Sequence, residues 1–298
     1  MKIKEQRSYP KDQEEETGAL YLVPTPIGNL QDMTFRAVDT LKKADIIAAE
    51  DTRHTKKLCH AFEITTSLIS YHEHNKRERE EELVNRVKSG EMVALVSDAG
   101  MPAISDPGAD IVKRMTEEGL PVISLPGANA AVTALVGAGL PTDSFTFAGF
   151  LDRNKKTRKK ELEQWQASPS TLIFYEAPHR LKEMVSALLD SFGNRQAVLC
   201  RELTKQFETI LRGDLEALKE YIEKEGVKGE CVVVVEGASE REREAAAGAP
   251  WWETLTLKEH VTSYIQKGET SKQAIKLTAL DRDMPKREVY QAYHVENN

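Results

Sequence analysis

The sequence predicts an α/β protein with two α/β lobes, a ligand site in the cleft between the lobes, and a small helical C-terminal unit. Between residues 20 and 236, short runs of Val, Ile, Leu and Phe alternate with amphipathic helical patterns. Most of these runs lack polar alternation, which indicates strands that are buried on both faces. The number of strands exceeds one compact sheet, so we expect two lobes, and inter-lobe clefts are favoured ligand sites.

The expected elements follow from apolar runs, helical spacing and capping residues. Strands are predicted at 19–23, 45–49, 92–96, 121–124, 145–150, 171–175, 197–201 and 230–235. Helices are predicted at 34–43, 75–89, 109–118, 130–138, 157–166, 178–191, 214–224, 256–267, 271–281 and 285–294. The corresponding organisation is a disordered tail (1–17), a first lobe (18–128), a second lobe (129–237), a linker (238–250) and a helical unit (251–298).

Composition narrows the class of protein. The chain of 298 residues is 40% hydrophobic, and no run of about 18 apolar residues predicts a membrane span. The first residues carry charge without an apolar core behind them, so we expect no secretory signal. Three widely spaced cysteines, Cys59, Cys200 and Cys231, favour neither zinc nor disulfides and suggest a reducing cytoplasm.

Charge is unevenly distributed along a chain whose net charge is −7. Six of the eight residues in 153–160 are basic: Arg153, Lys155, Lys156, Arg158, Lys159 and Lys160. These residues could simply form a solvent-exposed helix start without a binding role. Such a dense basic block nevertheless favours an anionic partner such as RNA phosphate. Residues 251–298 hold seven basic and seven acidic residues in helix-turn-helix spacing, so nucleic-acid contact and a packing role in a dimer stay equally open.

The clearest ligand signal is the apolar run 92–96 followed by Ser97-Asp98 and a loop with two glycines and two prolines. Open α/β sheets bind ligands at the carboxyl edge of their strands, where this loop lies. We therefore favour a ligand role for Asp98 over a turn-capping role. The loop after the first strand lacks the glycine patterns of dinucleotide folds and P-loops, so it predicts a ligand recognised through adenosine or an amino-acid moiety.

Several blocks then carry a resemblance to a known family. They are residues 25–30 (TPIGNL), 32–34 (DMT), 48–53 (AAEDTR), 71–75 (YHEHN), 97–100 (SDAG), 105–108 (SDPG), 139–143 (GLPTD), 174–180 (FYEAPHR) and 201–205 (RELTK). Over 18–236 the sequence resembles the class III S-adenosylmethionine methyltransferases of the tetrapyrrole methylase superfamily, and within them the ribosomal RNA small subunit methyltransferase I family. Met101 and Ala128-Asn129 depart from that pattern, which has Thr and Pro-Ser there.

The resemblance implies a function and partners. It implies S-adenosylmethionine-dependent methylation of the ribose 2′-oxygen of a cytidine in the decoding centre of 16S rRNA, cytidine 1402 in common numbering. The implied partners are 16S rRNA or the 30S subunit and a second copy of the chain, with no membrane and no metal. The C-terminal unit resembles the helical extension of that family.

The resemblance also implies which positions hold the methyl donor. They are Pro26, Ile27, Asp98, Met101, Asn129, Ala130, Tyr175, Glu176, Glu202 and Cys231. Backbone groups at strand ends suit the adenine edge and the methionine ends of this donor, and a carboxylate suits ribose hydroxyls or positive charge.

Methyl transfer from a sulfonium needs positioning and a general base rather than a metal. The catalytic candidates are Glu50, Asp51, Arg53 and Glu176, although residues 50–53 fit an internal salt bridge at a helix start equally well. His72 and His74 are two apart, but no third ligand stands out, so nucleotide contact is favoured over a metal. His179 and Arg180 are predicted at the start of a helix, where binding an anion and capping the helix are equally good interpretations.

Two other functions remain as alternatives. A tetrapyrrole methylase would share the fold, but most of the blocks above are not general superfamily motifs. A non-enzymatic ligand sensor that binds DNA through residues 251–298 is disfavoured because this segment has no basic excess.

Overall fold

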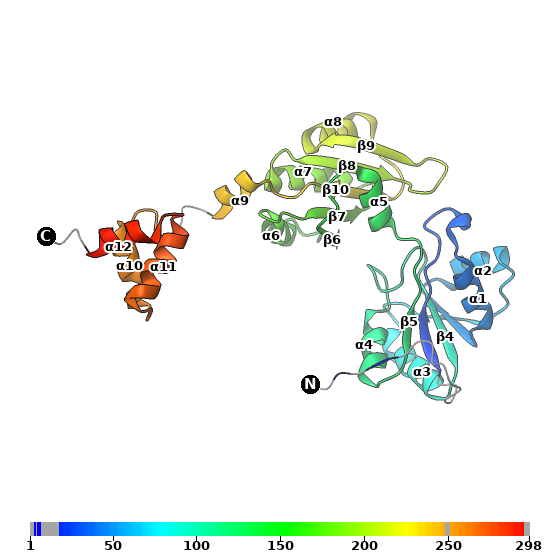
Figure 1. Cartoon of the computed structure of the whole chain (residues 1–298). Coiled ribbons are helices and arrows are strands. Elements are labelled where there is room, and N and C mark those ends of the chain that lie inside the picture. The colour runs from blue at the N-terminus through cyan, green and yellow to red at the C-terminus, as the bar shows by residue number, and fades with distance from the viewer. Residues whose placement is uncertain (1–2, 4, 7–17, 248–250, 295–298) are drawn as a thin grey trace. The chain divides into compact units, whose positions relative to one another are not determined.

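The structure, a computed structural model, describes residues 3, 5–6, 18–247 and 251–294. The chain divides into two compact units, Met1–Ala238 and Ser239–Asn298, which are described separately (Figure 1). The first unit contains two five-stranded sheets. In the described part of the chain, no helix is long and apolar enough to cross a membrane.

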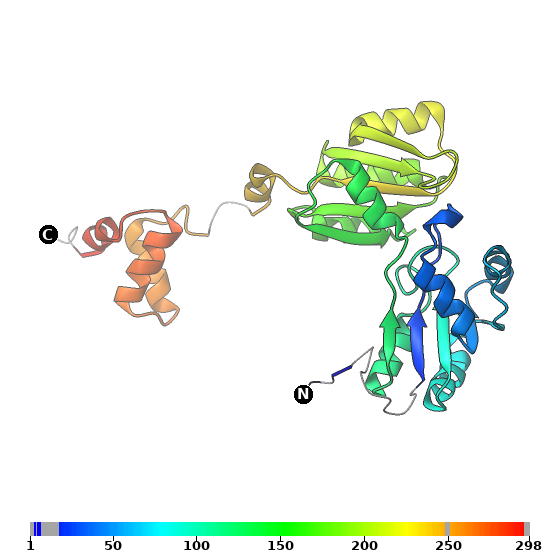
Figure 2. The same ribbon diagram turned by 45° about the vertical axis from the view of Figure 1, so that its right-hand side comes forward.

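The first sheet is entirely parallel, in the order β3-β2-β4-β1-β5. Its strands are β1 (Ala19–Leu22), β2 (Ile46–Ala49), β3 (Leu68–Ser70), β4 (Met92–Val96) and β5 (Val122–Ser124). Its helices are α1 (Phe35–Lys43), α2 (Thr52–Ala61), α3 (Lys76–Lys88) and α4 (Ala109–Glu117). Figures 1 and 2 show these helices on the two faces of the sheet.

Alternation along β4 explains why both faces are apolar. Ala94 and Val96 pack into the core beneath α1 and α2, whereas Val93 and Leu95 pack into the core beneath α3 and α4. Successive side chains of a strand point to opposite faces, so a strand covered on both sides needs a continuous apolar run. That run ends at Ser97, where the chain reaches the carboxyl edge of the sheet.

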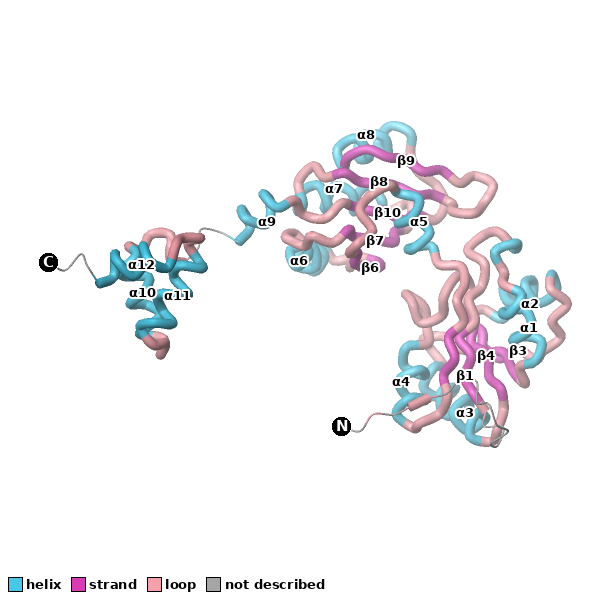
Figure 3. Tube along the Cα trace, viewed as in Figure 1, coloured by secondary structure: helices cyan, strands magenta, loops and turns pink. Residues whose placement is uncertain are grey.

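The second sheet is mixed, in the order β6-β7-β10-β8-β9, with only the β6–β7 pair parallel. Its strands are β6 (Phe145–Phe150), β7 (Thr171–Glu176), β8 (Gln196–Arg201), β9 (Thr209–Asp214) and β10 (Cys231–Val235). Three helices, α6 (Lys155–Trp165), α7 (Leu181–Phe192) and α8 (Leu215–Glu225), contribute to the core of one face. Helix α5 (Ala130–Ala138) packs on the other face (Figure 3).

The structure adds elements that the sequence patterns did not predict. Strands β3 and β9 are edge strands, only partly buried, and therefore lack a long apolar run. Helix α2 is largely basic and polar and buries mainly Leu58 and Cys59. A helix, α9 (Glu240–Ala247), occupies much of the segment that was expected to be a linker. Most of the expected N-terminal tail lies outside the described residues, but Gln6 exchanges two hydrogen bonds with the backbone of Val122.

The second unit also holds three short helices, α10 (Leu257–Gln266), α11 (Ser271–Asp281) and α12 (Lys286–His294), around its own core. His260 is fully buried there, with its ring stacked between Trp252 and Tyr264. Its Nδ1 accepts a hydrogen bond from Arg282 Nε at 3.2 Å, and its Nε2 lies 3.1 Å from Asp281. These contacts suit a neutral imidazole that carries its proton on Nε2.

Candidate active site

Two loops at the carboxyl edge of the first sheet are joined to each other. Thr25 and Gly100 exchange backbone hydrogen bonds of 2.9 Å in both directions, and the Thr25 hydroxyl donates to the carbonyl of Ser97. Gly100 has φ +81°, a conformation that favours glycine. The loops that follow β1 and β4, which the sequence marked as ligand-binding, therefore form one rigid structure.

The loop after β1 also contacts the second sheet. Ile27 is buried in the core that α5 shares with that sheet. A Cβ atom added to Gly28 would lie 2.4 Å from Cγ of Lys205, so only glycine allows this approach without a shift. The backbone N–H of Asn29 donates to the Thr204 hydroxyl at 3.1 Å. The two lobes thus meet closely on one side of the site.

A cavity of about 330 Å³ lies beside these contacts, which is within the range of small-ligand pockets. Its lining is Ile27, Ala99, Gly100, Met101, Ile104, Ser105, Asp106, Asn129, Ala130, Phe150, Tyr175, Glu176, Ala177, Pro178, Glu230, Cys231 and Val232. Seven of the expected donor-binding residues are in that lining: Ile27, Met101, Asn129, Ala130, Tyr175, Glu176 and Cys231. We call this space the donor cavity.

Three of the expected donor-binding residues do not line the donor cavity. Pro26 adjoins it through Ile27, and Asp98 accepts a hydrogen bond from the backbone N–H of Asp51. Glu202, at φ +52°, accepts from the backbone N–H of Glu230 and from Lys205 Nζ. In this structure, Asp98 and Glu202 therefore organise the loops around the cavity.

The wall supplied by α5 is held by Tyr175 and Asn129. The Tyr175 hydroxyl accepts a hydrogen bond of 3.0 Å from the backbone N–H of Ala131. Asn129 caps the same helix by accepting from the backbone N–H of Val132. Burial raises the pKa of Tyr175, so this phenol stays neutral. Largely apolar walls with a few polar groups suit a ligand that combines an aromatic base, a sugar and a charged chain.

An acidic residue that was not among the candidates, Asp106, lines the donor cavity. Burial, together with the nearby charges of Glu50 and Asp98, raises the pKa of Asp106 to about 6, while a hydrogen bond from Ser97 opposes the rise. Burial and Asp98 also raise the pKa of Glu50. The sequence marked Asp106 only as one of two aspartates in the segment that follows residues 92–96 and as part of the SDPG block. A carboxylate in this wall suits a cationic ligand.

Residues 50–53 form the internal salt bridge at a helix start that the sequence allowed as an alternative to a catalytic role. Asp51 caps α2 by accepting from the backbone N–H of Arg53, and it also pairs with the guanidinium of Arg53. This pairing holds the pKa of Asp51 well below its usual range. None of Glu50, Asp51 and Arg53 lines the donor cavity.

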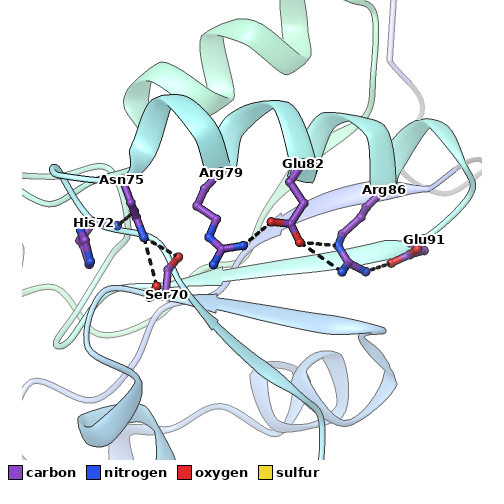
Figure 4. Close-up of polar contacts among 7 residues, drawn as sticks. All are labelled: Ser70, His72, Asn75, Arg79, Glu82, Arg86 and Glu91. Carbon is purple, nitrogen blue, oxygen red and sulfur yellow. Dashed lines mark hydrogen bonds and ion pairs between the residues drawn. The ribbon is translucent and has the colours of Figure 1, made fainter.

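His72, which Figure 4 shows, and His74 precede α3 in the chain. The His72 backbone N–H donates to Asn75, whose amide donates back to Ser70. Figure 4 also shows ion pairs from Arg79 to Glu82 and on to Arg86 along the helix. The two histidine rings lie 5.9 Å apart, and the described residues contain no group of three or more side chains suited to a metal.

A second space of about 560 Å³ adjoins the donor cavity. Its lining is Phe150, Leu151, Asp152, Arg153, Glu176, Ala177, His179 and Arg180. We call this space the outer hollow. Arg180 donates to the carbonyl of Leu151 and lies 3.4 Å from Glu176 Oε2, so its charge faces this wall. Three of the expected RNA-binding residues, Arg153, His179 and Arg180, thus come together here.

The basic segment 153–160 forms the start of α6, capped by Asn154. Its cations are exposed at Arg153, Lys155, Lys156, Lys159 and Lys160. Arg158 is an exception and a correction to the prediction, because its side chain is 3% exposed and pairs with Glu183 at 2.5 Å. Arg158 points to the same face of α6 as the buried Leu162, and so it is not available to a phosphate.

Comparison with known families agrees with this architecture. Residues 19–219 match the family model described as Tetrapyrrole (Corrin/Porphyrin) Methylases. Among solved structures, uroporphyrin-III C-methyl transferase from Thermus thermophilus complexed with S-adenyl homocysteine has a TM-score of 0.53 and 19% identity, covering 74% of this chain and 97% of that chain. Diphthine synthase has a TM-score of 0.57 and 16% identity, covering 76% and 93%. These two likenesses concern the fold.

Curated relatives match nearly the whole chain. Ribosomal RNA small subunit methyltransferase I of Bacillus subtilis (strain 168) is 54% identical over 278 residues, which cover 93% of this chain and 94% of that protein. The protein of the same name from Halalkalibacterium halodurans is 52% identical, covering 99% and 100%. The one from Synechocystis is 44% identical, covering 92% and 96%.

Proposed function

Because this chain belongs to the ribosomal RNA small subunit methyltransferase I family within the tetrapyrrole methylases, it is an S-adenosylmethionine-dependent rRNA methyltransferase, and we propose that it methylates a ribose 2′-oxygen. The proposed acceptor is a cytidine in the decoding centre of 16S rRNA, presented by the RNA or by the 30S subunit. The observation that carries this proposal is a donor cavity at the carboxyl edge of the first sheet, in a chain similar to rRNA methyltransferases over nearly its full length.

The residues of the donor cavity fit the methyl donor. Ile27, Met101 and the start of α5 provide apolar surface and backbone groups for adenosine. Asp106 provides negative charge for a cationic ligand once it is ionised. S-adenosylmethionine supplies an electrophilic methyl group on a positively charged sulfur. The protein has to hold donor and acceptor in line, and such positioning contributes roughly 7–11 kcal/mol in favourable cases.

The exposed cations of α6 support an RNA substrate. Lys155, Lys156, Lys159 and Lys160 lie on one helical segment, close in sequence to Arg153 in the outer hollow. RNA binding by such cations releases counterions, so methylation should weaken as salt is added. His72 and His74 are proposed to contact a neighbouring nucleotide from the first lobe. We also propose a cytoplasmic location, which a ribosomal substrate supports.

A second copy of the chain is the proposed protein partner. A further hollow of about 390 Å³ is lined by Ile27, Asp32, Thr34, Gly127, Ala128, Asn129, Val132, Thr133 and Thr204. Large apolar side chains close to it in sequence are exposed: Phe35 by 93%, Val136 by 74% and Phe207 by 66%. We propose that these exposed apolar side chains belong to the surface that the second copy covers. Sedimentation of the full chain, with a dimer expected, tests this.

The direct test of the function uses radiolabelled S-adenosylmethionine. The full chain is incubated with 30S particles that lack the modification, with isolated 16S rRNA, and with a porphyrinoid as the control substrate. We expect label on RNA, recovered after nuclease digestion as 2′-O-methylcytidine. Label on a base, or on the porphyrinoid alone, would contradict the proposal.

A further inference from the structure

The donor cavity and the outer hollow share part of their walls. Phe150, Glu176 and Ala177 line both spaces, so the two open beside each other at the ends of β6 and β7. The outer hollow is also lined by Arg153, Arg180, His179 and Asp152. A molecule in the outer hollow therefore lies next to a molecule in the donor cavity and near two arginines.

Glu176 has an unusual environment in this shared wall. Its side chain is 1% exposed, and its Oε1 accepts a hydrogen bond of 2.9 Å from the backbone N–H of Ala177. Its Oε2 lies 3.4 Å from Arg180 Nη2 and accepts no hydrogen bond from any residue that the structure describes. Buried carboxylate oxygens nearly always have a hydrogen-bond donor, because leaving one without a donor costs about 1–3 kcal/mol or more. This oxygen therefore has unused capacity to accept a hydrogen bond, and because its accessible surface is below 1 Å², a ligand reaches it only when the shared wall adjusts.

Phe150 gives the outer hollow an aromatic surface. Its side chain is 55% exposed at the end of β6, and its ring lies edge-on to Tyr175 at 5.6 Å. Exposed aromatic rings provide stacking surfaces for unpaired bases of RNA. Together with Arg153 and Arg180, this ring matches a nucleotide, which combines a flat base, a hydroxylated sugar and phosphate.

We propose that the outer hollow receives the acceptor nucleoside, turned out of the RNA, and that Glu176 Oε2 takes the proton of its ribose 2′-hydroxyl. This inference rests on the proposed function and specifies the substrate side of the same site. The O–H bond breaks and its proton passes to Glu176. The hydroxyl oxygen forms a bond to the methyl carbon, and the pair of electrons from the broken carbon–sulfur bond stays on sulfur.

The other candidates for the base lie elsewhere. Asp51 is paired with Arg53, and Glu50, His72 and His74 are in the lining of neither space. Asp106 lines only the donor cavity, and His179 lines only the outer hollow. Among the titratable side chains that the structure describes, Glu176 alone lines both, so it touches donor and acceptor together.

The test begins with Glu176→Gln, which keeps an oxygen for the Ala177 N–H and removes the charge. We expect single-turnover methyl transfer to 30S particles to fall by about 10²- to 10⁴-fold, the range for loss of a general base. We expect the Kd for S-adenosylhomocysteine, measured by calorimetry, to change by less than about threefold. The matched control is Glu163→Gln, an exposed carboxylate on α6, which should behave as the unmodified protein.

A second arm tests the nucleoside site itself. Phe150→Ala and His179→Ala, both at exposed side chains, should each raise the KM for 30S particles roughly tenfold and leave the Kd for S-adenosylhomocysteine unchanged. If Glu176→Gln lowers the melting temperature by more than about 10 °C, the KM values of Phe150→Ala and His179→Ala provide the test instead. Unchanged KM values in both variants would overturn the nucleoside site.

The outcomes separate this inference from the proposed function. If the unmodified protein places no label on 16S rRNA, the proposed function fails. If the unmodified protein labels 16S rRNA and Glu176→Gln does so at a similar rate, only this inference is wrong. If Glu176→Gln loses affinity for S-adenosylhomocysteine as strongly as it loses rate, Glu176 serves the donor and the proton goes to another group.

Discussion

The first sheet meets the donor cavity with loops, whereas the second sheet meets it with the ends of its strands. Ile27, Gly100 and Met101 belong to loops that follow β1 and β4, and their placement depends on backbone geometry. Tyr175 and Cys231 belong to β7 and β10, whose ladder fixes them. Apart from the Asp106 carboxyl, the first lobe therefore contributes mainly shape and backbone groups, and the second contributes positioned side chains.

Strand direction explains this difference. All strands of the first sheet are parallel, so every loop after a strand leaves the same edge. In the second sheet β7 and β10 are antiparallel, so the last residue of β7, Glu176, pairs with the first residue of β10, Cys231. A mixed sheet can thus place the end of one strand and the start of another at one point without long loops.

Among variants that test the difference between the two lobes, we expect the largest effect from removing the lysines of α6, and it concerns RNA binding. Replacing Lys155, Lys156, Lys159 and Lys160 by Ala should weaken binding of 30S particles roughly hundredfold at low salt and flatten its salt dependence, because phosphate contacts are lost. Filter binding across a salt series measures both quantities. Donor affinity should stay the same, because none of these lysines lines the donor cavity.

The control for that variant comes from the first lobe. Lys42, Lys43, Lys56 and Lys57 are equally exposed, on α1 and α2. Their replacement by Ala removes the same charge and should have a much smaller effect on 30S binding. Equal losses in the two variants would show that net charge, rather than the α6 surface, governs binding.

The next effect concerns the backbone of the first lobe. Gly28→Ala places a Cβ 2.4 Å from Lys205 Cγ and 3.0 Å from the Thr204 hydroxyl, so the loop that carries Ile27 must move. We expect affinity for S-adenosylhomocysteine to fall about tenfold, which corresponds to about 1.4 kcal/mol. Gly137→Ala is the matched control, because its Cβ would make an ordinary contact of 3.6 Å with Ile210. Unchanged affinity in Gly28→Ala would count against close loop packing at this point.

A smaller effect concerns charge in the same lobe. The pKa of Asp106 is raised to about 6, so its carboxyl becomes negative only as the pH rises through that value. Affinity for the sulfonium donor should therefore increase severalfold between pH 5 and pH 7.5, and Asp106→Asn should abolish this increase. Calorimetry with S-adenosylhomocysteine, whose sulfur is uncharged, provides the comparison and should show a weaker pH dependence.

The same variant has a predictable effect on stability. Because the folded-state pKa of Asp106 lies above its ordinary value of 3.8, the stabilising contribution is complete at low pH and is lost as the pH rises through about 6. At pH 7.5 Asp106→Asn should thus raise the free energy of unfolding by on the order of 1 kcal/mol. A lower melting temperature at pH 7.5 would mean that the carboxylate has partners that offset its burial.

The smallest effect concerns one side chain of the second lobe. Tyr175→Phe removes the oxygen that accepts the Ala131 N–H but keeps the ring against Phe147 and Phe150. Loss of one such hydrogen bond costs about 1 kcal/mol, so donor affinity should fall about threefold to fivefold. Tyr221→Phe, at a side chain that is 40% exposed on α8, should leave affinity unchanged.

Local sequence patterns predicted the buried parts of the fold better than its edges. The apolar runs of β4 and β10 identify central strands, because only strands covered on both faces need such runs. Edge strands such as β9 include charged or polar residues and resemble loops. Arg158 shows a signal that could have been used, since its spacing of four residues from Leu162 places it on the inward face of α6.

The family resemblance identified part of the lining of the donor cavity, but it did not predict how neighbouring groups change a residue's state. It implied donor contacts for Tyr175 and Cys231, and both line the cavity. The pKa of Asp106 is raised first by burial and then by the charge of Glu50, which lies more than fifty residues away in the sequence. Such proximity arises only when β2 and β4 pair in the folded sheet.

The buried imidazole of the C-terminal unit makes that unit sensitive to acid. Burial lowers the pKa of His260 below its ordinary 6.5. At a pH between the pKa of the folded unit and 6.5, the unfolded chain therefore binds a proton at this imidazole and the folded unit does not. The free energy of unfolding of the unit that contains α10 and α11 is therefore greatest above pH 6.5. It declines as the pH falls, by at most about 1.4 kcal/mol per pH unit. Acidification thus destabilises the C-terminal unit, whereas protonation of Asp106 stabilises the first unit, so the two units of one chain respond to protons in opposite directions.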